Sequence, residues 1–294
     1  MDKTIFRLMG GIGNQLFIYH AAKYYEKLTG FSVAFDLTDI YKNRNNHFGT
    51  IRLLNIPREK EITKKSHFTF SNQLLQKIPF SKSFLDETVV FKEIGFSKEL
   101  LNVPLGSKVQ GYFQSYLFTK EIEKSLEKQI LSLLENSWAS HYFKEMEKEK
   151  ENIISIHIRR GDYVNLSHSI GLLSENYYSD ALRISLENFS GNKVWIFSDD
   201  IEIAKKLFKK INVFDLLATY IETPINESPV ISLGLMSQSK NLIIANSTFS
   251  WWAARLFEDS INKTVFVPNK WFRNMPDPKD LNNRKWVKVD SNWK

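Results

Sequence analysis

The stretch that decides the fold reads ENIISIHIRRGDY and runs from Glu151 to Tyr163. Its centre has the period-two alternation of a β-strand, in which successive side chains point to opposite faces of a sheet. Isoleucines share one face, and the other face carries Ser155, His157 and Arg159. Because the strand ends at residues 159–162, RRGD, charged groups gather at a carboxyl end, where ligands bind in open α/β sheets.

Outward from this stretch, short runs rich in β-branched and aromatic residues predict further buried strands. These runs are TIFRL from Thr4, VAF from Val33, VQGYF from Val109, VWIFS from Val194, LIIANS from Leu242 and VFVP from Val265. Amphipathic segments of helix length lie between them, at residues 14–28, 119–134, 177–189 and 249–257. Strands and helices alternate, so the sequence predicts an α/β protein with mainly parallel sheets.

A charged tract, KEMEKEKEN at residues 144–152, immediately precedes the decisive strand. We place a domain boundary there, between an N-terminal domain at residues 1–148 and a C-terminal domain at residues 149–294. Two facing Rossmann-like domains are expected, although the tract could instead be the end of a surface helix in one large domain. Residues 37–105 have poor periodicity, which predicts loops and short helices that recognise much of any acceptor.

Composition narrows the class of protein. The chain has 294 residues, of which 43% are hydrophobic and 25% charged, as in folded globular proteins. Cysteine is absent, which excludes disulfides, thiolate zinc sites and a cysteine nucleophile. Neither a signal-peptide core nor an apolar run of about 18 residues is present, so we expect a cytoplasmic location. The net charge of +7 comes from scattered basic residues, which does not favour nucleic acid as a partner.

A glycine turn follows the first predicted strand, in TIFRLMGGIGNQLF. A strand, a glycine turn and a helix start let backbone N–H groups approach a phosphate or a sugar. The dinucleotide fingerprint is incomplete, because Gly11 and Gly13 are followed by Leu16 instead of a third glycine, although Asp36 stands where a ribose-binding acid would be. A nicotinamide enzyme is therefore disfavoured. The turn could also need no ligand at all.

The arginine pair after the decisive strand suits a diphosphate. A guanidinium group offers a planar fork to phosphate oxygens and keeps its charge at every relevant pH. Arg159 and Arg160 are therefore candidate anion ligands. In the alternative interpretation, Arg159 and Asp162 form an internal ion pair at the end of the strand.

Two other predicted strands also end in polar residues. In VWIFSDD, Asp199 can accept hydrogen bonds from a ribose or from guanine, while Asp200 suits the N-cap of the next helix. Metal chelation by this segment is weakly supported, because a strict Asp-x-Asp triplet is absent. In NLIIANSTFSWWAARL, Ser247 and Thr248 start a helix, whose free N–H groups bind anions, although either hydroxyl could be a simple cap.

Taken together, these motifs resemble the bacterial α-1,2-fucosyltransferase family. The similarity rests on GGIGNQLF, VQGYFQS, HIRRGDYV, IFSDD, and LMS followed by NLIIANSTFSWWAARL, in order from Gly10 to about Trp271. It implies a GT-B architecture in which the C-terminal domain holds most of the GDP-fucose. It also implies inverting transfer of L-fucose to the 2-hydroxyl of a galactose-terminated glycan, with no required metal or other cofactor.

The resemblance assigns expected roles to individual residues. The donor-binding stretch contains His157, Arg159, Arg160 and Asp162, with Arg159 as the diphosphate clamp. Asp199 matches a guanine contact, and the phosphate-side loop contains Ser247, Thr248 and Ser250. The N-domain loop that faces the sugar contains Gly11, Gly13 and Asn14. Asp162 is the candidate catalytic base, although it could instead orient Arg159 or Arg160, the two arginines that precede it in the sequence.

Three departures from the family and several alternatives accompany this prediction. Ser232, Ser239 and Ala253 stand where family members commonly carry an acidic residue, a cysteine and a glycine. The chain could instead be a protein O-fucosyltransferase, another GDP-sugar transferase or a non-catalytic nucleotide-sugar-binding protein. We expect an enzyme that builds a bacterial surface glycan such as O-antigen on a lipid carrier, with the positive charge favouring peripheral contact with the inner membrane.

Overall fold

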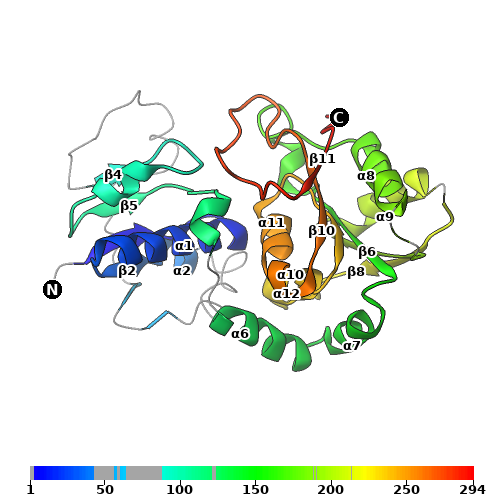
Figure 1. The fold of residues 1–294 in the computed structure, drawn as a ribbon, viewed down its shortest axis with the longest axis horizontal. Helices are drawn as coiled ribbons and strands as arrows, with labels where there is room; N and C mark the ends of the chain where they lie inside the picture. Colours follow the sequence, from blue (N-terminus) through cyan, green and yellow to red (C-terminus); the bar gives the residue numbers. More distant parts are fainter. Residues whose placement is uncertain are drawn as a thin grey trace. The chain divides into compact units, whose positions relative to one another are not determined.

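The computed structural model describes residues 3–42, 56–57, 60–63, 88–120, 124–187, 189, 191–212 and 214–294. The chain divides into two compact units, each with its own sheet (Figure 1). Unit 1 comprises Met1–Ile122 and Pro278–Asn283, and unit 2 comprises Glu123–Asp277 and Arg284–Lys294. Every pairing between the named strands is parallel, so the predicted α/β class with parallel sheets is confirmed.

Unit 1 is built on β1 (Thr4–Arg7), the central strand of a sheet with the order β3-β2-β1-β5-β4. Buried aromatic side chains from β1 and from α1 (Ile12–Thr29) form its core, with the rings of Phe6 and Tyr25 5.7 Å apart. The other elements are β2 (Val33–Asp36), α2 (Thr38–Lys42), β3 (Glu61–Ile62), β4 (Thr88–Val90), η3 (Lys98–Asn102), β5 (Lys108–Gln110) and η4 (Tyr116–Thr119).

A short segment from the far end of the chain, Pro278–Asn283, completes unit 1. The backbone N–H of Tyr116 and the hydroxyl of Ser115 both donate to the carbonyl of Asp280, over 2.8 and 2.9 Å. Gly95 packs directly against the backbone of Lys279, so closely that a Cβ at this position would overlap it. The chain therefore leaves unit 1 for unit 2, returns for this segment and leaves again.

Unit 2 contains β6 (Ile153–Ile158), the strand predicted from the alternating pattern. The sheet order is β11-β10-β9-β6-β7-β8. Numbered along the chain from β6, this is the Rossmann order 3-2-1-4-5-6, which reverses between β6 and β9. The remaining strands are β7 (Lys193–Ser198), β8 (Leu217–Ile221), β9 (Asn241–Ile243), β10 (Thr264–Pro268) and β11 (Val287–Val289).

Helices cover both faces of this sheet (Figure 1). Ile154, Ile156 and Ile158 of β6 pack in one core cluster with side chains of α8 (Glu175–Glu187) and α9 (Ile201–Ile211). On the opposite face, His157 lies against Phe249 of α11 (Thr248–Arg255). Trp251 and Trp252 are both fully buried, so neither is placed to stack on a ligand. The other helices are η5 (Asp162–Val164), α10 (Pro229–Ser237) and α12 (Glu258–Ile261).

The division between the units falls earlier than the boundary placed at residues 148 and 149. Two helices before that boundary, α6 (Lys124–Glu135) and α7 (Ser140–Glu149), belong to unit 2. Gly234 of α10 allows close contact with Ile130 of α6, and Lys193 of β7 forms ion pairs with Glu145 and Glu149. The charged tract is thus the exposed end of a helix that packs on unit 2. Residues 37–105 contain short elements, and much of that region lies outside the described residues.

Candidate functional site

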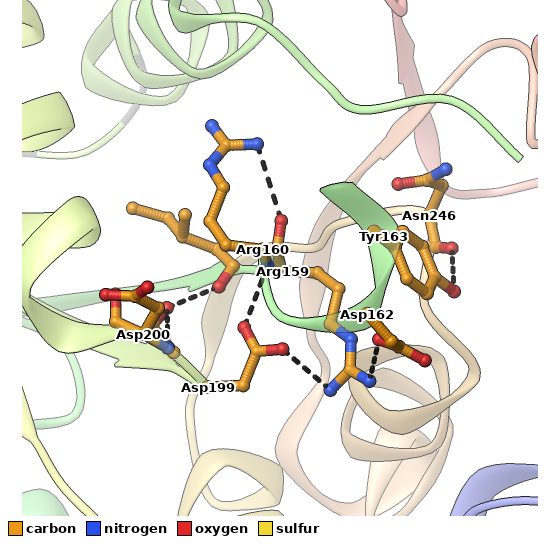
Figure 2. Close-up of polar contacts among 9 residues, drawn as sticks. Arg159, Arg160, Asp162, Tyr163, Asp199, Asp200 and Asn246 are labelled. Carbon is orange, nitrogen blue, oxygen red and sulfur yellow. Dashed lines mark hydrogen bonds and ion pairs between the residues drawn. The ribbon is translucent and has the colours of Figure 1, made fainter. Parts of the chain in front are cut away.

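Polar residues from three loops meet at the carboxyl end of the unit 2 sheet. Arg159 follows β6, Asp199 follows β7 and Asn246 follows β9, on both sides of the reversal in strand order. Figure 2 shows the side chains of these loops and their polar contacts. Their position is the one where open α/β sheets bind ligands, as the sequence predicted.

Arg159 is held by two carboxylates. Its Nη1 lies 3.1 Å from Asp199 Oδ2, and its Nη2 lies 2.5 Å from Asp162 Oδ1 (Figure 2). The ion pair between Arg159 and Asp162, the alternative kept open by the sequence, is therefore present. The Arg159 side chain is 27% exposed and that of Asp162 is 59% exposed, so an entering anion can reach this pair.

Asp199 organises the turn after β6. Its Oδ1 accepts the backbone N–H of Arg160 over 2.8 Å, while Oδ2 binds Arg159. Gly161 packs against the same carboxylate so closely that a Cβ would overlap Oδ2. Both oxygens of Asp199 thus contact the turn, in a position for which the sequence predicted a guanine contact. Asp200 caps α9 as predicted, because its Oδ1 accepts the N–H of Ile203.

The guanidinium groups of Arg160 and Arg159 do not lie at the same site. The Arg160 side chain points in the opposite direction (Figure 2), is 4% exposed and donates from Nη1 to the carbonyl of Leu173 over 2.9 Å. Its Cζ also lies 5.8 Å from the centre of the Tyr178 ring. The structure therefore does not form the arginine fork pair expected from the sequence, and Arg160 instead holds the loop around residue 173.

His157 is a buried, neutral imidazole beside the turn. It is 3% exposed, and its ring lies 5.5 Å from that of Phe249. Burial, together with the nearby charge of Arg159, lowers the pKa of His157 to about 3. Its Nδ1 has no hydrogen-bond partner among the described residues. At neutral pH this residue therefore offers an uncharged ring nitrogen and no positive charge.

The loop after β9 leads into the N-terminus of α11. Ser247 is the N-cap residue by backbone geometry, but its side chain makes no capping hydrogen bond, which leaves the positive end of the helix without a side-chain cap. Thr248 is half-buried at the first helical position. Ser250 points inward, with Oγ donating to the carbonyls of Ala245 and Ser247. The first two residues remain candidates for an anion site, whereas Ser250 supports the loop.

The side chain of Asn246 holds the same loop in place through hydrogen bonds. The two N–H groups of its Nδ2 are shared among three backbone carbonyls, those of Ile170, Gly171 and Trp271, over 3.2 to 3.3 Å. Tyr163, which sequence reasoning did not single out, donates from its hydroxyl to the carbonyl of Asn246 over 3.1 Å (Figure 2). The tyrosine could have been found from its place in HIRRGDYV, immediately after the charged residues, but nothing in the pattern indicated its partner.

The predicted glycine loop lies in unit 1, at the start of α1. Gly10 has the positive φ, 72°, whereas Gly11 is the extended N-cap residue beside open space, and Gly13 is buried in the helix. Asn14 accepts a hydrogen bond from Gln114 Nε2 over 2.9 Å, which joins the loop to the VQGYFQS motif. The sequence therefore located the loop correctly but missed the roles of Gly10 and Gln114.

Two classes of feature are absent from the described part of the chain. It contains no group of three or more His, Asp or Glu residues that could hold a metal ion. It also contains no helix that is both long and apolar enough to cross a membrane.

Comparison with known proteins assigns the family. The model of glycosyl transferase family 11 matches residues 4–290. The chain belongs to this family. The chain is therefore a glycosyltransferase, and the resemblance to the bacterial α-1,2-fucosyltransferases is confirmed at family level.

Relatives of this glycosyltransferase include two proteins of Escherichia coli. An alpha-1,2-colitosyltransferase is 33% identical over 99% of this chain and 100% of its own length. The O-antigen biosynthesis glycosyltransferase WbnK is 32% identical over 90% of this chain and 93% of its own length. Among solved structures, the fucosyltransferase NodZ from Bradyrhizobium aligns with a TM-score of 0.46 and 13% identity, over 87% of this chain and 92% of that chain.

Proposed function

We propose that this glycosyltransferase transfers L-fucose from GDP-β-L-fucose to the 2-hydroxyl of a β-galactoside, with inversion, in the synthesis of a bacterial surface glycan such as O-antigen. The observation that carries the proposal is that Arg159 follows β6 and the α11 N-terminus follows β9, the neighbouring strands at the reversal in strand order. This arrangement supplies a guanidinium fork and helix N–H groups, both of which bind phosphate oxygens.

The departing GDP needs stabilisation of its growing negative charge. Arg159 can supply it by exchanging Asp162 for a phosphate oxygen while keeping Asp199. The exchange costs little, because an exposed ion pair contributes only about 0 to 1 kcal/mol to stability. The fixed guanidinium and the helix end are already oriented before the bond breaks, so they stabilise the leaving group without rearrangement.

Inversion requires a single displacement in which the acceptor hydroxyl attacks opposite the leaving GDP. A carboxylate on the acceptor side can take the proton. Asp162 is a candidate, but its contact with Arg159 supports the orienting role more than the base role. In that case the hydroxyl loses its proton late, to a weak base or to water, as the sugar becomes cation-like.

One observation supports a second candidate for the donor sugar. The relative that is 33% identical over almost the whole of both chains is named as a colitosyltransferase. Colitose is fucose without its 3-hydroxyl, so the same diphosphate site and the same acceptor hydroxyl would serve either sugar. The choice then depends on contacts with the 3-hydroxyl, since a site built to bind a hydroxyl strongly rejects the donor that lacks it.

The decisive experiment offers the purified protein GDP-fucose and GDP-colitose in parallel, each with a panel of β-galactosides. We expect an α-1,2-linked product from GDP-fucose, identified by NMR. Faster transfer from GDP-colitose would replace the donor in this proposal and keep the reaction type. Tight GDP binding without turnover on any glycan would support a binding protein, and transfer only to protein acceptors would support an O-fucosyltransferase.

The cellular setting forms part of the same proposal. The acceptor is a galactose-terminated glycan, and an acceptor built on a lipid carrier would bring the enzyme to the inner face of the cytoplasmic membrane. The net charge of +7 would favour that contact. Cell fractionation at low salt tests it, because a protein found wholly in the soluble fraction would contradict the membrane contact while leaving the reaction unaffected.

A further inference from the structure

Tyr163 connects the two halves of the candidate donor site. Its ring lies beside Arg159 on the β6 side, with the guanidinium carbon 5.2 Å from the ring centre. Its hydroxyl donates to the carbonyl of Asn246 on the β9 side, over 3.1 Å. One side chain therefore contacts both the proposed diphosphate ligand and the loop that starts α11.

We propose that Tyr163 is a positioning residue for the donor diphosphate: it holds the guanidinium of Arg159 in a fixed place relative to the N-terminus of α11. This inference rests on the proposed function, because it assumes that these two groups bind the same diphosphate. It adds a residue that acts on the phosphate through Arg159 and the loop.

The first step of the argument concerns Arg159. Asp162 and Asp199 bind the two terminal nitrogens, and the aromatic ring contacts the guanidinium carbon from the side of Tyr163. When a phosphate replaces Asp162, two contacts remain, those with Asp199 and with the ring. The ring carries no charge that a phosphate could displace, so it keeps the fork oriented during donor binding.

The second step concerns the loop after β9. The carbonyl that accepts the Tyr163 hydroxyl belongs to Asn246, whose own side chain is tied to three backbone carbonyls. Tyr163 therefore binds to a rigid point of the loop. The next residue, Ser247, is the N-cap of α11. A displacement of Tyr163 would shift Arg159 relative to the helix N–H groups.

The third step excludes a chemical role for the hydroxyl. Burial raises the pKa of Tyr163 to about 12, so the hydroxyl keeps its proton at every pH at which the enzyme would be assayed. A protonated hydroxyl that donates to a backbone carbonyl is a fixed hydrogen bond and not a proton acceptor. Its effect should therefore appear in donor affinity, without a change in the pH profile of transfer.

Tyr177 provides a matched control. Its hydroxyl also donates to a backbone carbonyl that follows β9, that of Ile244, over 2.6 Å. The residue is fully buried in the core cluster and makes no contact with Arg159. The Tyr177 hydroxyl also has a weaker second acceptor, the carbonyl of Phe266, over 3.5 Å. Tyr177→Phe and Tyr163→Phe thus each remove a tyrosine hydroxyl that donates to the backbone just after β9, and only Tyr163 contacts the candidate site.

The experiment measures GDP affinity by calorimetry for the wild-type protein, Tyr163→Phe, Tyr163→Leu and Tyr177→Phe, with the KM for donor, the KM for acceptor and kcat. We expect Tyr163→Phe to weaken GDP binding about three- to tenfold, the net effect of one hydrogen bond. Tyr163→Leu should weaken it by about a further three- to tenfold, because the ring contact is also lost. The KM for acceptor should stay unchanged, and Tyr177→Phe should bind GDP as the wild type does.

Two results would overturn the inference. Equal GDP affinity in Tyr163→Phe, Tyr163→Leu and the wild type would show that the tyrosine only supports the fold. Equal weakening in Tyr163→Phe and Tyr177→Phe would show a general loss of stability instead of positioning. A wild-type protein that binds no GDP would instead contradict the proposed function itself, so the two failures are distinguishable.

Discussion

At the scale of single residues, the two terminal nitrogens of the Arg159 guanidinium bind two carboxylates that come from different loops. A lysine has the same charge but a single ammonium group, which cannot bind two separated oxygens in this planar geometry. We expect Arg159→Lys to lower kcat/KM on the order of 10²-fold, as the loss of one preorganised donor to a developing anion does. Steady-state kinetics test this directly.

The matched control for that substitution is Arg183→Lys, in an exposed ion pair with Glu187 on α8. It makes the same chemical change away from the candidate site and should leave kcat/KM unaltered. Near-normal kinetics in Arg159→Lys would assign Arg159 to structure alone, and the diphosphate would then need another ligand.

Asp162 gives a second prediction at this scale. If Asp162 only holds Arg159 until a phosphate oxygen displaces it, Asp162→Asn removes a competing charge, so GDP affinity should rise by a few-fold, as expected for an exposed pair, while kcat is retained. A catalytic base would behave differently, with kcat lost and GDP affinity intact. Calorimetry with GDP alongside single-turnover kinetics separates the two roles, and unchanged values for both would remove Asp162 from the mechanism.

The lowered pKa of His157 makes the free energy of unfolding depend on pH. This pKa is lowered from the usual 6.5 to about 3 in the folded protein, so between these values the unfolded chain binds a proton that the folded chain does not. The free energy of unfolding must then fall as pH decreases through this range, by up to about 2 kcal/mol between about pH 7 and pH 5. Urea unfolding at several pH values should show a shallower dependence in His157→Gln.

The control for this prediction is His168→Gln, which replaces an exposed histidine near the same turn. Its pH dependence should match that of the wild type. A His157→Gln protein whose stability falls with pH as steeply as the wild type would mean that the imidazole accepts its proton without cost in the folded state.

At the scale of elements, the sequence predicted what depends on local patterns. The alternation of Ile154, Ile156 and Ile158 identified β6, and Asp200 identified the start of α9, because side-chain period and capping are properties of neighbouring residues. The direction of the Arg160 side chain was not predictable, since it depends on a carbonyl at residue 173. The contact between Tyr163 and Asn246 likewise joins residues that are distant in the chain.

The prediction at the scale of elements concerns the turn after β6. In Gly161→Ala the new methyl group would overlap the carboxylate that binds both Arg159 and the backbone of Arg160. Either Asp199 or the turn must move, so we expect GDP affinity to fall by at least about tenfold, with a loss of roughly 1 to 3 kcal/mol in stability from overpacking. Calorimetry and thermal unfolding measure the two effects separately.

Gly30→Ala is the control for Gly161→Ala. Gly30 has a φ of 72° at the end of α1, with nothing near the position of a Cβ. An alanine there should cost about 1 kcal/mol of stability through backbone strain alone. If both alanine variants kept wild-type GDP affinity, the turn would tolerate displacement and Asp199 would not need to hold it.

At the scale of the whole molecule, the prediction concerns metal ions. Arg159 and the α11 N-terminus can together stabilise the leaving diphosphate, so we expect transfer by the intact enzyme to continue at nearly the same rate in EDTA. The assay compares initial rates with and without the chelator. Loss of activity in EDTA that Mg²⁺ or Mn²⁺ restores would contradict this account, and Asp199 and Asp200 would then be candidate metal ligands.

The segment Pro278–Asn283 affects how this molecule can be made. Phe96, Ser115 and Tyr116 leave the ribosome long before Lys279 and Asp280, their backbone partners, have been synthesised. At about 5 to 20 residues per second, the delay is roughly ten seconds or more. Unit 1 therefore emerges first during translation but stays incomplete until Pro278–Asn283 has followed most of unit 2, and throughout that interval the nascent chain exposes backbone groups that only this late segment can pair.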